Sequence, residues 1–283
     1  MQKNFYCLLI FIGITCTLHA QTKPARLIVR SDDMGFSHAG NLGIIESYKN
    51  GIETSVEILV PSPWFPEAVE LLKQNERIDV GIHLTLTSEW DNIKWRPLTQ
   101  CPSLTDSNGY FYPMIWANKN YPDKNLLAHQ WKFDEIEKEW RAQIETALRA
   151  IPRISHISAH MGCTNINDSV YALASRLAKE YDIDIEPKDF HVTDAAYEGA
   201  HGTSGEKVQS FINMLNKLEP GKTYLFVDHP AINSPELQAV HHLGYENVAE
   251  DRQGVVDVFT SSTVKQLIKQ KGILLIGYKD LVK

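Results

Sequence analysis

The chain has 283 residues, of which 43% are hydrophobic and 22% charged, and this composition excludes a disordered or fibrous protein. Its formal net charge is −7, which argues against nucleic acid as the main partner because phosphate binding needs clustered Lys and Arg. Four cysteines in a chain of this length exclude a disulfide framework.

The first twenty residues differ in composition from the rest. Lys3 precedes an apolar run over 5–14, and Leu18-His19-Ala20 supplies a small residue before a cleavage point. This pattern predicts a secretory signal peptide over 1–20, with the protein exported to the periplasm or secreted. Lipid attachment at Cys16 is a weaker alternative. The apolar run is shorter than the roughly 20 residues of a membrane-spanning helix, so no membrane span is expected.

From residue 21 onward, apolar strand-like runs alternate with helical patterns. In chain order the sequence predicts a strand over 26–30, a helix over 38–50, a strand over 54–60, a helix over 66–74 and a strand over 78–84. A long loop rich in Trp, Tyr, Pro and Asn follows, to about residue 130. Next come a helix over 133–150, a strand over 154–158, a helix over 168–181 capped by Asp168, and a short strand over 183–185. The last elements are a helix over 204–218, a strand over 223–228, a helix capped by Ser262 and a strand over 273–277.

About seven strands alternating with helices predict a parallel sheet covered by helices. Residues 21–283 contain no internal linker or repeat, so we expect a single domain. Its length favours a closed or nearly closed β/α barrel. The sequence leaves open whether Cys101 and Cys163 pair.

Reactive side chains of parallel β/α folds gather where the strands end. Four of the predicted strands end in carboxylates or imidazoles, namely Asp32-Asp33, His83, His156 with His160, and Asp228-His229. These groups at one rim are the composition of a divalent metal site with an adjacent base.

Each assignment also has an ordinary structural alternative. The Asp32-Asp33 pair is typical of a solvated turn, because adjacent carboxylates repel each other unless a cation or hydrogen bonds compensate. A lone histidine such as His83 at a buried strand end is more often a hydrogen-bonded core residue than a ligand. His156 and His160 would point to the same side of an extended segment, so that one would be a ligand and the other would orient it.

At these residues the sequence resembles the YdjC-like carbohydrate deacetylases, also called the chitooligosaccharide deacetylase family. The matching segments run in family order and cover nearly all of the mature chain. They are Ser31-Asp32-Asp33-Met34-Gly35, Val-Gly-Ile-His-Leu-Thr-Leu-Thr at 80–87, His-Ile-Ser-Ala-His at 156–160, His229-Pro230 and the closing segment 272–281. The Asp-Asp motif combined with Gly-x-His-Leu-x-Leu-Thr is fairly specific.

The resemblance implies a distorted (β/α) TIM-like barrel that hydrolyses N-acetyl groups of mono- or oligosaccharides with one divalent metal ion, zinc or magnesium. It implies three metal ligands, Asp33, His83 and His160. Asp32 would be the general base, and His229 is the best candidate for the general acid. Two alternatives stay open: a metal-dependent esterase or amidase on another substrate, and a catalytically degenerate carbohydrate-binding protein. A homodimer is also left open.

The chain departs from the family pattern at Ser158, where the family usually has Asp, and at Arg30, where a small or polar residue is more usual. The candidate substrate-binding residues are Trp64, Trp90, Trp95 and Arg30, because flat aromatic faces could stack on pyranose rings. The alternative is that these aromatic rings pack the long loop against the barrel.

Overall fold

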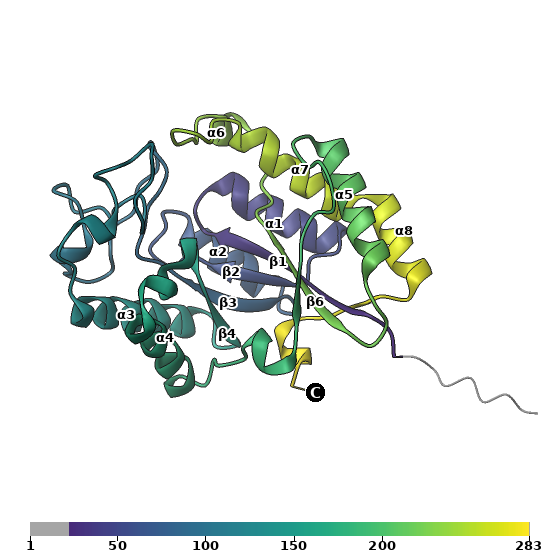
Figure 1. Cartoon of the computed structure of the whole chain (residues 1–283), viewed down its shortest axis with the longest axis horizontal. Helices are drawn as coiled ribbons and strands as arrows, with labels where there is room; N and C mark the ends of the chain where they lie inside the picture. The colour runs from purple at the N-terminus through teal and green to yellow at the C-terminus, as the bar shows by residue number, and fades with distance from the viewer. Residues whose placement is uncertain (1–22, 283) are drawn as a thin grey trace, which may run out of the picture.

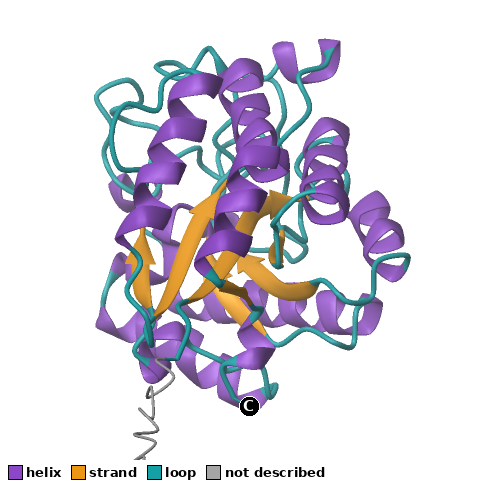
Figure 2. Ribbon diagram, turned by 90° about the vertical axis from the view of Figure 1, so that its right-hand side faces the viewer, coloured by secondary structure: helices purple, strands orange, loops and turns teal. Residues whose placement is uncertain are grey.

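Apolar strands form the centre of the fold (Figures 1 and 2). The computed structural model describes residues 23–282, so the predicted signal peptide over 1–20 lies outside the described residues. The strands are β1 (Arg26–Met34), β2 (Ser55–Ile58), β3 (Asp79–Leu84), β4 (His156–Ala159), β5 (Thr193–Ala195), β6 (Thr223–Asp228) and β7 (Leu274–Leu275).

The seven strands form one sheet in the order β4-β3-β2-β1-β6-β5, with β7 beside the start of β1. Every pairing among them is parallel. Within residues 23–282 the outer strands β4 and β5 do not pair with each other, so the barrel is left open along that side. The expected α/β fold, a distorted barrel of about seven parallel strands, is confirmed.

Helices cover this sheet, with α3 and α4 beside β4 and the group α5, α7 and α8 beside β1 and β6 (Figure 1). The helices are α1 (His38–Asn50), α2 (Phe65–Lys73), α3 (Phe133–Ala150), α4 (Asp168–Glu180), α5 (Ser204–Lys217), α6 (Pro235–Gln238), α7 (Val248–Thr260) and α8 (Ser262–Lys271). Short 3₁₀ helices include η3 (His160–Ile166), directly after β4, and η5 (Tyr278–Asp280). In the described part of the chain, no helix is long and apolar enough to span a bilayer.

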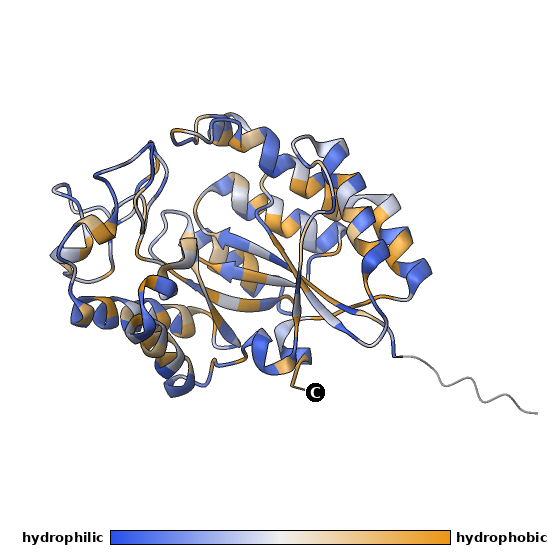
Figure 3. Cartoon of the chain, viewed as in Figure 1, coloured by the Kyte–Doolittle hydropathy of each residue, from blue (hydrophilic) through white to orange (hydrophobic). Residues whose placement is uncertain are grey.

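The alternation of side chains along β1 divides the hydrophobic core. Leu27 and Val29 pack under α5, α7 and α8, whereas Ile28 faces the other way and packs with Leu225 and Tyr278. All three β1 residues are fully buried. Hydrophobic residues follow the strands and the inner faces of the helices, as Figure 3 shows. The core therefore holds the strand ends, and the side chains on them, in fixed positions.

Three sequence predictions differ from the structure. The strand predicted over 183–185 is wrong: the strand that pairs with β6 is β5, whose Thr-Asp-Ala sequence lacks an apolar pattern. The helix caps lie one residue earlier than predicted, at Asn167 and Ser261. Helix α7 was not expected, because it is buried on several sides, between α1 and α5 among others, and so shows no single apolar stripe.

Candidate metal centre

Strand β1 carries both aspartates of the acidic pair beyond its predicted end. Asp33 has a φ of +68°, a backbone conformation that is uncommon outside glycine and concentrates at functional sites. The next turn holds this conformation, because the Gly35 amide donates a hydrogen bond of 2.8 Å to Asn41 Oδ1. Gly35 itself has a φ of +109°, and a Cβ there would lie 2.6 Å from Ser62 Oγ.

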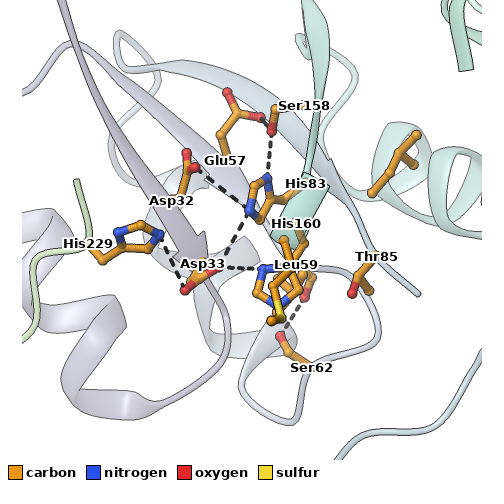
Figure 4. A network of polar contacts seen from close by, with 12 residues as sticks. Asp32, Asp33, Glu57, Leu59, Ser62, His83, Thr85, Ser158, His160 and His229 are labelled. Atoms are coloured by element: carbon orange, nitrogen blue, oxygen red, sulfur yellow. Dashed lines mark hydrogen bonds and ion pairs between the residues drawn. The ribbon is translucent and has the colours of Figure 1, made fainter. Parts of the chain in front are cut away.

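The three predicted ligands come together at the end of the sheet (Figure 4). One ligand atom each from Asp33, His83 and His160 lies within 4.8 Å of the others, and all three residues are buried. His83 Nε2 is 3.5 Å and His160 Nδ1 is 3.0 Å from Asp33 Oδ1. β1, β3 and the start of η3 supply one residue each, so the parallel sheet brings together residues far apart in the sequence.

Carboxyl and hydroxyl groups orient the two histidines. His160 Nε2 lies 2.9 Å from Glu89 Oε2, which leaves Nδ1 facing Asp33. Burial lowers the pKa of His160, but Glu89 and Asp33 outweigh burial and raise it to about 10. Burial lowers the pKa of His83 below its ordinary value, which favours the neutral imidazole that binds metals.

This arrangement fits a divalent cation. Asp33 Oδ1 is buried and accepts no hydrogen bond of good geometry from the described residues, and the two ring nitrogens face it. Burial raises the pKa of Asp33, but His160 and then His229 outweigh burial and hold it well below its usual range. One carboxylate and two imidazoles are ligands that suit zinc and related divalent ions.

Asp32 lies beside the three ligands and is held by Arg30. Asp32 Oδ2 is 3.8 Å from His83 Nε2, and the Arg30 guanidinium donates to Asp32 Oδ2 at 3.0 Å. Arg30 also donates to the Tyr278 hydroxyl at 2.8 Å. Only 14% of the Arg30 side chain is exposed, and its contacts hold Asp32, while its role as a sugar contact stays a prediction.

His229 lies on the opposite side of Asp33 from the two ligand histidines (Figure 4). Its Nε2 is 3.8 Å from Asp33 Oδ2, and its amide donates to the neighbouring Asp228 carboxylate. Burial lowers the pKa of His229, but Asp33 and Asp228 outweigh burial and raise it. Because 39% of the side chain is still exposed, His229 can reach a group that enters from solvent.

Asp33 has a further partner that the sequence did not indicate. The Arg252 guanidinium, from α7, donates to Asp33 Oδ2 at 3.1 Å and lies over the rings of Phe36 and Trp90. Arg252 is buried. Asp33 Oδ2 therefore faces Arg252 and His229, while Oδ1 faces His83 and His160.

The three tryptophans proposed for substrate binding differ in exposure. Trp90 and Trp95 are only 1% and 3% exposed, so their faces are unavailable to a sugar, and the alternative of loop packing is correct for both. Trp90 packs against Phe36 and Tyr245, with ring centroids 5.9 and 6.0 Å away. Trp64 is 38% exposed and stays a prediction as a sugar contact.

His156 was expected to orient a ligand histidine directly, but it contacts Glu57 instead. Its Nε2 is 2.6 Å from Glu57 Oε1, and its ring stacks on Tyr278 with centroids 3.5 Å apart. It contacts neither ligand histidine through any hydrogen bond that the described structure contains. Its connection to His83 runs through Glu57 and Ser158.

Sequence reasoning missed Glu57, Glu89 and Arg252. Glu57 carried a usable signal, because it is a lone charge inside the apolar run Ser-Val-Glu-Ile-Leu-Val at 55–60. Glu89 follows the His83 motif within a long loop, and Arg252 belongs to a helix that was not predicted. Cys101 and Cys163 are both buried free thiols, which answers the question of their pairing.

Comparisons with known proteins agree with this picture. A family model described as YdjC-like protein matches residues 26–270. A carbohydrate deacetylase of Clostridium beijerinckii is 32% identical over 268 residues, covering 90% of this chain and 100% of the relative. A carbohydrate deacetylase of Enterococcus faecalis is 30% identical, with 90% and 98% covered. The crystal structure of a putative cellobiose-phosphate cleavage protein from Enterococcus faecalis superposes with a TM-score of 0.70 and 27% identity, over 92% of this chain and 99% of that chain.

Proposed function

The chain belongs to the YdjC-like family, and we propose that it is an exported, metal-dependent hydrolase that removes N-acetyl groups from saccharides. The observation that carries this proposal is the cluster of Asp33, His83 and His160. The carboxylate of Asp32 and the imidazole of His229 lie beside it. Two relatives, whose alignments each cover 90% of this chain, carry the name carbohydrate deacetylase, which supports the same substrate class.

Amide hydrolysis needs an activated water, a base and an acid that protonates the leaving amine. When bound, a divalent cation supplies Lewis-acid polarisation of the acetamide carbonyl and lowers the pKa of a water molecule. Asp33, His83 and His160 would hold it.

Asp32 would take the proton of the attacking water. Arg30, whose Nε lies 2.8 Å from Asp32 Oδ1, holds this carboxylate beside the ligand cluster. Arg30 also restricts the direction in which Asp32 points.

His229 would give a proton to the leaving amine from the other side. Its raised pKa keeps the imidazole protonated over more of the neutral range, which is the state in which it can donate. Asp228 restrains it through the His229 backbone amide, since the Asp228 Oδ1 to His229 amide distance is 2.8 Å.

The test is acetate release from a panel of N-acetylated mono- and oligosaccharides. We expect release that stops on chelation and returns when zinc or magnesium is added. Asp32→Asn should abolish it, whereas Asp123→Asn, a change at an exposed loop position, should not. A metal-loaded protein that releases no acetate across the panel would contradict the proposal.

Two matched measurements separate the alternatives. Faster turnover of O-acetyl than of N-acetyl substrates would favour an esterase. Sugar binding without turnover would favour a binding protein. Fractionation of cells that produce the full chain tests export, since a cytoplasmic, unprocessed protein contradicts the proposed signal peptide over 1–20.

A further inference from the structure

We propose that Glu57 is the carboxylate that orients His83, and that it acts through the hydroxyl of Ser158, so that both are positioning residues for the metal centre. This inference rests on the ligand role of His83 in the proposed function. His160 has a direct carboxylate partner in Glu89, and no carboxylate within the described chain hydrogen-bonds directly to His83 Nδ1.

Sheet register places the three groups side by side. His83 of β3 pairs with Ser158 of β4, and two residues earlier Gly81 lies between Glu57 of β2 and His156 of β4. Residues two apart on a strand share a face. Gly81 has no side chain, so Glu57 and His156 meet above it. A Cβ at Gly81 would lie 2.7 Å from Glu57 Oε1 and 2.5 Å from His156 Nε2.

The donors and acceptors available fix the direction of the hydrogen bonds that link Glu57, Ser158 and His83, here called the relay. The Glu57 side chain is fully buried, and its carboxylate oxygens lie 2.6 Å from His156 Nε2 and 2.6 Å from Ser158 Oγ. An ionised carboxylate only accepts hydrogen bonds, and a hydroxyl has one proton to give. Ser158 therefore donates to Glu57.

The Ser158 oxygen is left to accept from His83. Ser158 Oγ lies 2.6 Å from His83 Nδ1, so the imidazole proton belongs on Nδ1. The lone pair of His83 is then on Nε2, the atom that faces Asp33 Oδ1 at 3.5 Å. The relay thus selects the tautomer that can bind a cation in the centre.

Electrostatics agree with the direction of the relay. Burial raises the pKa of Glu57, but His156 and then Arg30 outweigh burial and lower it to about 2. The buried negative charge is therefore present at neutral pH and polarises the hydroxyl that holds His83.

The experiment uses the full chain stripped of metal, with Zn²⁺ alone as the probe in calorimetry. Ser158→Ala and Glu57→Gln should each weaken Zn²⁺ binding by about 10–100-fold, and Ser158→Thr, which keeps the hydroxyl, should restore it. The double variant should be no weaker than the weaker single variant, because both changes interrupt one relay.

Ser47→Ala is the matched control, since Ser47 is also a buried serine, lies on α1 and has no hydrogen-bond partner for its hydroxyl in the described structure. Its Zn²⁺ affinity should equal that of the wild type, and comparable unfolding temperatures would show that Ser158→Ala is folded. Long-range ¹H–¹⁵N NMR of the metal-free protein gives a second readout, in which His83 should carry its proton on Nδ1 and lose that preference in Ser158→Ala.

Unchanged affinity together with an unchanged His83 tautomer in Ser158→Ala would overturn the relay, and so would additive losses in the double variant. Acetate release is measured on the same samples. A wild type that shows the relay but releases no acetate contradicts the proposed function and leaves the relay intact.

Discussion

Gly81→Ala is a small substitution for which the structure predicts a large effect. The position lies in the middle of β3, outside the positive-φ region, so the backbone itself accepts alanine. At a site with free space around it, this change would stabilise the protein by about 0.4–1 kcal/mol, because alanine lowers the conformational entropy of the unfolded chain. Here the new methyl group would meet the carboxylate of Glu57 and the ring of His156.

Both of these groups are fully buried, so neither can move out into solvent to make room. The methyl group must separate them, and each buried hydrogen-bonding group left without its partner costs about 1–3 kcal/mol. The expected net loss in the free energy of unfolding is therefore several-fold larger than the backbone gain. Zn²⁺ affinity should fall as well, because displaced Glu57 no longer holds Ser158.

Urea denaturation measures the first effect and calorimetry the second. Gly205→Ala is the control, because Gly205 is exposed on α5 and a Cβ there has no neighbour within 4 Å. It should gain stability and keep its Zn²⁺ affinity. Equal unfolding free energies for the two variants would refute the reasoning about the Glu57–His156 pair.

Three further predictions follow from named contacts. Asp32→Asn should lower kcat by about 10²–10⁴-fold while calorimetry finds Zn²⁺ affinity retained, and a loss of binding instead would make Asp32 a ligand. Asn41→Ala should cost about 1–3 kcal/mol in urea denaturation, because it removes the acceptor for the Gly35 amide, and an unchanged midpoint would show that the turn does not depend on it. Burial raises the pKa of Glu53 well above its ordinary 4.5, so the folded state keeps a proton that the unfolded chain loses, and stability should fall as pH rises above 4.5. Glu53→Gln should remove that decline when denaturation is compared at acid and neutral pH, and parallel pH profiles would contradict the assignment.

Local patterns predicted much of the fold. The helices at 38–50 and 133–150 were placed with their observed bounds, because 133–150 has a clear apolar stripe and Gly51 marks the end of the first helix. Strand β5 was missed because it pairs at an open edge of the sheet, where its exposed residues need no apolar alternation. Pairing with β6 rather than hydrophobicity makes it a strand.

The candidate site divides in the same way. The strand ends indicated that Asp33, His83 and His160 lie at one rim, and the family resemblance implied that these three are the ligands. The groups that orient them come from positions that no local pattern marks, such as Glu89 in a long loop. The burial of Trp90 could not be predicted either, because it depends on how that loop packs on Phe36 and Tyr245.

Tyr278 belongs to the closing segment of the chain, yet its ring lies against His156 and its hydroxyl against Arg30. During synthesis, the ribosome completes the strands that carry the three ligands more than a hundred residues before it reaches this tyrosine. A nascent or prematurely terminated chain would therefore contain the candidate metal ligands but lack the Tyr278 hydroxyl that holds Arg30 beside Asp32. The proposed hydrolytic activity would therefore appear only after the ribosome has passed Tyr278.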